Sequence, residues 1–264
     1  MPFIYFLRHG STPAHEGKVD ARRLQGREEV FRDSLYERFK NMYNLSDLGK
    51  YQSYSAGGIM LALGATAKNL KVFASPQTRT QEAAQIACDI ICDKGHEVEI
   101  NTLEELNVLD MGRLTGELEG YNDGEVNAKM LMHPQAPTKY GSEPIPQFMH
   151  RIGKAYKIIV QPLKEGKDVF VCGHVCGIPL MMIMVTRPEL FMSEGLTEDQ
   201  MKANRKEVDR LYLEYDKVVT EGSAIAFDTE TKELTKYTMG QNEAFEIQSE
   251  LIYSSNGASE TVFG

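Results

Sequence analysis

The chain has 264 residues, of which 42% are hydrophobic and 25% charged, an ordinary composition for a globular protein in water. Its formal net charge of −9 argues against binding nucleic acid or an anionic membrane over a broad surface. No apolar run approaches the ~20 residues of a membrane helix, and no basic leader precedes the first strand pattern, so we expect a cytoplasmic location and no membrane partner.

A short apolar run at residues 3–7 leads directly into Arg8, His9 and Gly10. This run predicts a buried central strand that ends in a tight turn, with both polar side chains at its carboxyl end, where open α/β sheets bind ligands. A neutral imidazole is a competent nucleophile, an arginine can hold two phosphate oxygens, and Gly10 would let the backbone approach an anion. The alternative interpretation is a strand end with two solvated residues.

The segment after this turn is polar and carries further cations. After His15, residues 22–27 contain three arginines, among them Arg23. These arginines either hold an anionic substrate or belong to a solvated loop. A charged insert is expected at about 27–44. Ser46 then predicts the N-cap of a helix whose apolar or small positions continue at helical spacing to Leu63.

A second buried strand is predicted at 70–74, followed by Ser75 and Pro76 and then a helix. Arg79 falls in the first turn of that helix, where backbone N–H groups and the helix dipole favour an anion. An edge strand is expected within 97–102, an irregular insert at 113–146 and a helix at about 146–160.

The third buried strand is predicted at 168–172 and ends at Gly173 and His174, so that His174 repeats the position of His9. An apolar helix should begin at Gly177. The remaining expected elements are a charged, helix-prone insert at 186–218 and a hairpin or paired edge strands at 223–228 and 234–237. We therefore predict one domain over residues 1–240 and a partly mobile tail at 241–264.

The four cysteines form two pairs with three intervening residues, Cys88 with Cys92 and Cys172 with Cys176. Buried thiols in a reducing compartment explain this pattern better than a metal site, whose cysteines usually stand closer together. A secondary hypothesis is that oxidation of Cys172, two residues from His174, blocks the site.

Arg8, His9, Arg79 and His174 thus stand at three strand ends, a combination that predicts an anion pocket containing a nucleophile. At this point the chain resembles the histidine phosphatase superfamily, also called the phosphoglycerate mutase-like family. The matching segments occur in the family's order and are Leu7–Thr12, Arg23–Gly26, Leu45–Gly49, Ser75–Gln81, Gly141–Glu143 and Val171–His174.

The resemblance implies a three-layer α/β/α sandwich with a mostly parallel central sheet. It implies His9 as the phosphorylated nucleophile, with Arg8, Arg79 and a protonated His174 completing the phosphate pocket, and no metal or other cofactor. The residues expected to bind the substrate are Gly10, Thr12, His15 and Arg23, with histidine at position 15 where relatives often have asparagine. We expect the second nitrogen of His9 to donate to a backbone carbonyl.

The family's usual acid is a glutamate four residues before a glycine, and counting back from Gly112 gives Val108 instead. Glu105 is the preferred substitute, Asp110 is a second alternative, and weak protonation of the leaving group is a third.

The leading function is hydrolysis of a small phosphate monoester through a phosphohistidine. The alternatives are a phosphoglycerate-mutase-type phosphotransferase and a catalytically weak phosphate-binding or scaffold protein. The sequence leaves open the substrate, the role of the 27–44 insert, and whether the protein is a homo-oligomer.

Overall fold

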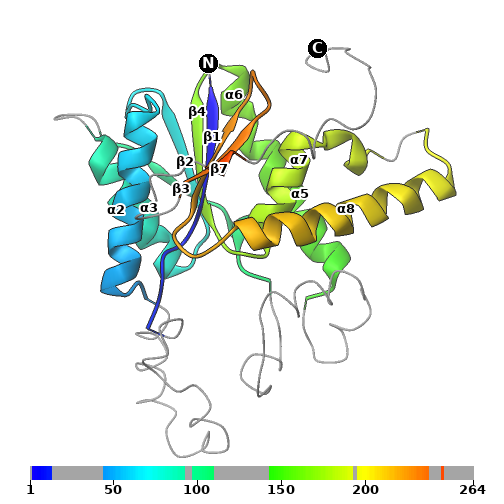
Figure 1. Cartoon of the computed structure of the whole chain (residues 1–264), viewed down its shortest axis with the longest axis horizontal. Helices are drawn as coiled ribbons and strands as arrows, with labels where there is room; N and C mark the ends of the chain where they lie inside the picture. The colour runs from blue at the N-terminus through cyan, green and yellow to red at the C-terminus, as the bar shows by residue number, and fades with distance from the viewer. Residues whose placement is uncertain are drawn as a thin grey trace, which may run out of the picture.

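The computed structural model describes residues 2–13, 44–92, 97–109, 143–192, 195–237 and 245–246. Its helices and strands lie in three layers, with the sheet in the middle (Figure 1). His15, Arg23, Asp110 and nearly all of the inserts predicted at 27–44 and 113–146 lie outside the described residues, as does most of the 241–264 tail.

Within this part of the chain the sheet has seven strands in the order β3-β2-β4-β1-β5-β6-β7. Their bounds are β1 Phe3–Arg8, β2 Leu70–Ala74, β3 Ile100–Thr102, β4 Asp168–Gly173, β5 Ala224–Asp228, β6 Leu234–Tyr237 and β7 Phe245–Glu246. The first four strands are parallel, whereas β5 pairs antiparallel with β1, β6 with β5 and β7 with β6. Five of the seven strands therefore run in one direction, which confirms the mostly parallel sheet.

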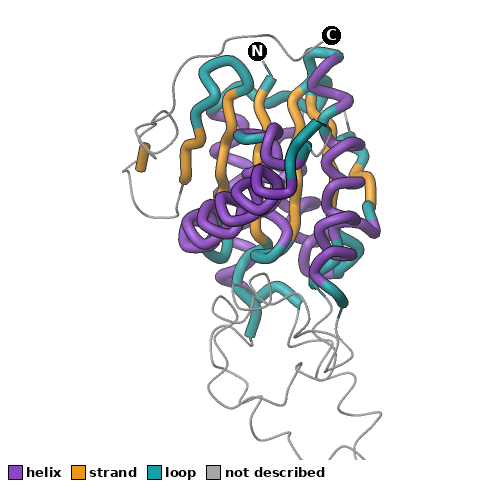
Figure 2. The backbone as a smooth tube through the Cα atoms, turned by 90° about the vertical axis from the view of Figure 1, so that its right-hand side faces the viewer, coloured by secondary structure: helices purple, strands orange, loops and turns teal. Residues whose placement is uncertain are grey.

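Helices cover both faces of this sheet. Helices α2 (Asp47–Ala62) and α3 (Thr78–Ile91) lie on one face, and α5 (Ile145–Ile159), α7 (Gly177–Thr186) and α8 (Glu198–Val218) lie on the other (Figure 1). In Figure 2 the strands stand side by side behind this second group of helices. The shorter elements are the 3-10 turns η2 (Glu104–Leu106) and η5 (Pro188–Phe191) and the short helix α6 (Gln161–Lys164).

Each face has its own hydrophobic core, and alternate residues of the central strands serve the two. In β1, Ile4 and Phe6 join the core under α5, α7 and α8, whereas Tyr5 and Leu7 join the core under α2 and α3. An unbroken apolar run is needed because both faces of the strand are covered. This confirms the prediction of a buried central strand at residues 3–7.

The helix-prone segment expected at 186–218 holds the end of α7, the turn η5 and all of α8. Helix α8 begins with a capping box at Thr197 and Gln200, and its second half buries Val208, Leu211 and Tyr212 in the core beside α7. After this helix the chain enters β5, which forms a hairpin with β6 and also pairs with the central strand β1. The expected hairpin is therefore present, but β5 is not an edge strand.

The three predicted strand ends lie level with one another. Leu7 is opposite Cys172, Arg8 is opposite Gly173, and Ala74 is also opposite Cys172. Residues that follow these positions consequently meet at the carboxyl end of the sheet.

None of the described helices has the length and apolar character to cross a lipid bilayer.

Candidate active site

His9, Arg79 and His174 are in mutual contact at the carboxyl end of the sheet. Nε of Arg79 donates to Nε2 of His9 at 3.1 Å, and Nη2 of Arg79 lies 3.4 Å from Nδ1 of His174. The centroids of the two imidazole rings are 5.3 Å apart, with an interplanar angle of 68°. Both rings are buried, His9 being 5% and His174 3% exposed. Three separate strand ends thus bring one guanidinium between two imidazoles.

The tautomer of His9 follows from its backbone contact. Nδ1 lies 2.9 Å from the main-chain oxygen of Gly10, which can only accept a hydrogen bond, so Nδ1 carries the proton. This agrees with the expected carbonyl partner. Nε2 of the neutral ring is then the nitrogen with the lone pair, and it faces Arg79.

His174 is held by Ser75, the residue that follows β2. Oγ of Ser75 is 2.8 Å from Nε2 of His174. Burial lowers the pKa of His174 well below its usual value, and the neighbouring His9 and the positive charge of Arg79 lower this pKa further. The imidazole is therefore neutral in the anion-free pocket, and the protonated His174 expected from the sequence requires an anion beside it.

The turn between α8 and β5 holds Arg8, a contact that the sequence did not reveal. The Arg8 guanidinium donates to the main-chain oxygen of Val219 at 3.2 Å and to Oε1 of Glu221 at 3.3 Å. The amide of Gly222 donates to the main-chain oxygen of His9 at 3.3 Å. No motif marked Glu221, because it stands 213 residues from its partner.

Gly10 makes a close backbone approach to helix α2. A Cβ atom on Gly10 would lie 2.3 Å from the main-chain oxygen of Gly49, and one on Gly49 would lie 2.1 Å from that of Ser11. Ser46 is the N-cap of α2, as predicted, and its hydroxyl accepts from the amide of Gly49. The turn after β1 therefore rests directly on the first turn of α2.

Among the other expected site residues, Thr12 follows this turn and is fully buried. Glu105 is the middle residue of η2 and is half-buried. The Val108 side chain packs against the hydrophobic core, so no proton donor occupies the position that the family pattern indicated.

All four cysteines are free, and Cys88, Cys172 and Cys176 are buried. Burial raises the pKa of Cys88 to about 12 and also raises the pKa of Cys172. Buried thiols of this kind form little reactive thiolate, which gives no support to redox control through Cys172. The described residues contain no cluster of His, Cys, Asp and Glu suited to a metal ion.

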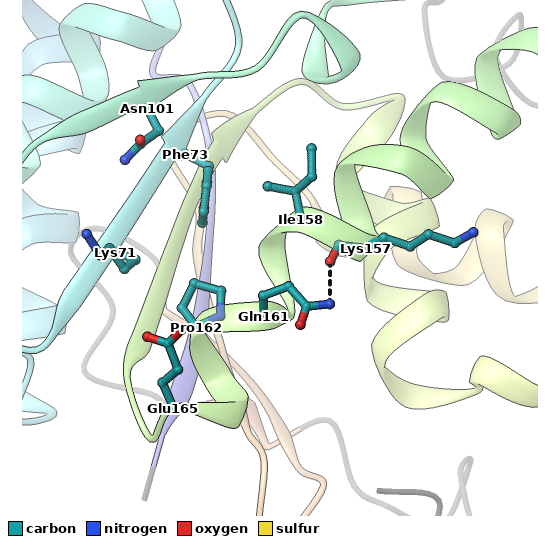
Figure 3. A pocket seen from close by; sticks show the side chains of 8 residues that line it. All are labelled: Lys71, Phe73, Asn101, Lys157, Ile158, Gln161, Pro162 and Glu165. Carbon is teal, nitrogen blue, oxygen red and sulfur yellow. Dashed lines mark hydrogen bonds between the residues drawn. The ribbon is translucent and has the colours of Figure 1, made fainter. Parts of the chain in front are cut away.

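A groove of about 420 Å³ lies away from this site (Figure 3). Its walls come from β2, β3, α5 and α6, and one of its lining residues, Gln161, donates a hydrogen bond to the main-chain oxygen of Lys157 at 3.1 Å. It contains none of the residues that the sequence assigned to catalysis or binding.

Comparison with protein families identifies one match, to the model described as the histidine phosphatase superfamily (branch 1), over residues 4–193. Comparison with curated proteins by sequence finds no significant match.

Several solved structures share the fold. A phosphoserine phosphatase variant from Entamoeba histolytica, in complex with phosphoserine, aligns over 90% of this chain and 96% of its own, with 13% identity and a TM-score of 0.52. The product of an open reading frame from Mycobacterium tuberculosis aligns over 92% and 95%, with 17% identity and a TM-score of 0.50. The ecdysone phosphate phosphatase from Bombix mori, in complex with tungstate, aligns over 75% and 82%, with 19% identity and a TM-score of 0.50. At these identities the likeness concerns the fold.

Proposed function

Because the chain belongs to branch 1 of the histidine phosphatase superfamily, we propose that it hydrolyses small phosphate monoesters through a phosphohistidine on His9. The observation that carries the proposal is the contact of Arg79 with both His9 and His174, in a buried site at the carboxyl end of the sheet. An anion that enters here displaces the hydrogen bond from Arg79 to Nε2 of His9, which frees the lone pair of that nitrogen for attack and the N–H groups of the guanidinium for the anion.

In the first step, Nε2 of His9 attacks the phosphorus atom and the bond to the ester oxygen breaks. Nδ1 keeps its proton and continues to donate it to the Gly10 carbonyl, so the second ring nitrogen stays hydrogen-bonded while the P–N bond forms on Nε2. Arg8, Arg79 and His174 compensate the charge on the equatorial oxygens, and a dianionic phosphate restores the proton to His174 by raising its pKa.

The leaving oxygen takes a proton from an acid, for which we propose Glu105. In the second step this carboxylate accepts a proton from water while the water oxygen attacks the phosphohistidine. The P–N bond breaks, inorganic phosphate leaves, and both His9 and Glu105 return to their starting states.

A phosphoglycerate-mutase-type phosphotransferase is the second candidate function. No described contact favours it over hydrolysis. Interconversion of phosphoglycerates that exceeds the release of inorganic phosphate would establish it. A scaffold without catalytic activity is the third, and rapid turnover of a phosphohistidine would exclude it.

The test is hydrolysis of an aryl phosphate by the wild-type protein and by His9→Ala. We expect a loss of about a thousandfold or more in kcat, because the nucleophile is removed. His150→Ala is the matched control, since His150 is an exposed histidine on α5. Activity that survives in His9→Ala, or the absence of a phosphorylated histidine in rapidly quenched wild-type protein, would refute the assignment.

A further inference from the structure

Arg151 on α5 has every donor of its guanidinium engaged by the protein. Nε and Nη2 each donate to one carboxylate oxygen of Glu143, both at 2.7 Å. Nη1 donates to the main-chain oxygens of Glu105 and Asn107 at 2.8 and 2.7 Å, and Nη2 donates to that of Val108 at 2.9 Å. These five hydrogen bonds match the five N–H groups of an arginine, so no donor is left for a substrate.

Three of these five acceptors come from one short segment, residues 104–109, which comprises η2 and the three residues after it and is called the η2 segment below. The last carbonyls of a helical turn have no partner within the turn and need one from elsewhere. Arg151 supplies these donors from a side chain that is itself 19% exposed and lies over the Phe148 ring, with Cζ 4.8 Å from the ring centroid. The guanidinium therefore fixes the backbone on both sides of Leu106.

The same segment has two contacts with residues that flank the site. Nε2 of Gln77, two residues before Arg79, donates to Oδ1 of Asn107 at 2.8 Å. The amide of Leu109 lies 3.4 Å from Sγ of Cys176, which is two residues after His174. The positive charge of Arg151 also lowers the pKa of His174, as expected of a guanidinium close to the pocket.

We propose that Arg151 is a positioning residue that holds the η2 segment so that the Glu105 carboxyl reaches the leaving oxygen of the substrate. The inference rests on the proposed phosphatase function. Glu143 serves as the anchor of Arg151, since its bidentate contact fixes the plane of the guanidinium. An arginine suits this role better than a lysine, whose ammonium has only three donors and no planar fork.

The test compares two substrates that differ in their need for an acid. Dinitrophenyl phosphate releases a stable anion that needs no proton, whereas phenyl phosphate releases a basic phenolate that does. For Arg151→Gln we expect kcat for phenyl phosphate to fall by about 100-fold, the lower range for loss of general acid catalysis. The kcat for dinitrophenyl phosphate and both KM values should stay within about threefold, since Arg151 has no donor that reaches the phosphate.

Arg210→Gln is the matched control, because Arg210 also binds carboxylates, those of Glu207 and Glu214, but lies on α8. Arg210→Gln should leave kcat unchanged for both substrates. Arg151→Lys should resemble Arg151→Gln, because the three donors of an ammonium cannot serve three carbonyls and both oxygens of Glu143 at once. Normal hydrolysis of dinitrophenyl phosphate by the same sample shows that the variant is folded.

A double-mutant cycle identifies the acid. In a Glu105→Gln background, Arg151→Gln should lower kcat for phenyl phosphate by less than about a further threefold, because both changes remove the same proton donor. Additive losses would overturn the proposal, as would equal losses on the two substrates or no loss on either. Should Arg151→Gln fail to fold, Glu143→Gln tests the same anchor with a smaller expected loss of the same selectivity.

These outcomes are separate from failure of the proposed function. If the wild-type protein hydrolyses neither ester, or if His9→Ala remains active, the phosphohistidine mechanism fails regardless of Arg151. If the wild-type protein is active and His9-dependent while Arg151 variants show no substrate selectivity, only the positioning role fails.

Discussion

The guanidinium of Arg79 lies between two buried imidazoles, and this arrangement determines the charge of the site. A buried histidine beside cations resists protonation, because no solvent or counter-ion compensates the added charge. His174 meets these conditions, because it is buried, lies next to the Arg79 guanidinium and has its Nε2 in contact with Ser75. The pocket therefore keeps a neutral ring ready for an anion.

This environment predicts a loss of stability in mild acid. The pKa of His174 is lowered in the folded state, so the unfolded chain binds the proton more tightly. The stabilising contribution of the neutral ring is fully present above the unfolded pKa of about 6.5 and is lost as the pH falls towards the folded pKa, at up to about 1.4 kcal/mol per pH unit.

Urea unfolding at pH 7, 6 and 5 measures this effect. The free energy of unfolding of wild-type protein should fall more steeply with decreasing pH than that of His174→Asn, whose side chain does not titrate. The comparison concerns the two slopes, since the substitution also changes stability at pH 7. Parallel slopes would show that His174 does not carry the linkage.

At the scale of elements, the junction between the turn after β1 and the first turn of α2 holds the nucleophile in place. Gly10 and Gly49 bring the two backbones closer than any side chain allows. The amide of Ser46 donates to the main-chain oxygen of Ser11 at 3.0 Å, and Gln52 accepts from the amide of Ser11 at 2.7 Å. The position of His9 thus depends on how closely α2 packs.

Two glycines of α2 offer a matched pair of substitutions. Gly49→Ala should destabilise the protein by about 1–3 kcal/mol, since the clash is with backbone atoms that no rotamer change can relieve. Gly58→Ala on the same helix should be stabilising by roughly 0.5–1 kcal/mol, because the added methyl group meets nothing within 4 Å and alanine favours the helix.

Urea midpoints of the two variants test this prediction, and kcat for an aryl phosphate should fall only in Gly49→Ala. Equal stability of the two variants would mean that the contact between the turn and α2 is looser than the structure describes.

At the scale of the whole molecule, a sheet covered on both faces leaves its thiols in two separate cores. Cys88 and Cys172 belong to the core under α2 and α3, and Cys176 belongs to the core under α5, α7 and α8. Cys92, at the end of α3, is partly exposed. Access to three of the four thiols therefore requires opening of the fold.

An aromatic disulfide reagent should label Cys92 rapidly in the native protein, whereas the other three thiols should react only on unfolding in urea. Cys92→Ser should remove the rapid phase, and Cys172→Ser should leave both that phase and the peroxide sensitivity of hydrolysis unchanged. Rapid labelling of native Cys172 would revive the redox hypothesis.

The sequence by itself determined the parts of this protein that follow from local patterns. Apolar runs bounded by Gly and Pro located β1, β2 and β4, because strands covered on both faces must be apolar throughout. Arg8, His9 and His174 stand at the ends of such runs and Arg79 in the first turn of the helix after β2, so the sequence predicted that these residues gather at one edge of the sheet.

Only the tertiary structure decided which residues support that site. Arg8 meets Glu221 across 213 residues, and Arg151 meets the Glu105 carbonyl across 46. Such partners have no periodicity or spacing to reveal them, because their contact depends on how α5 and the α8–β5 turn pack around the sheet. The close contact of Gly10 with α2 has the same origin: glycine allows a close backbone approach, and the packing of α2 brings the Gly49 backbone to it.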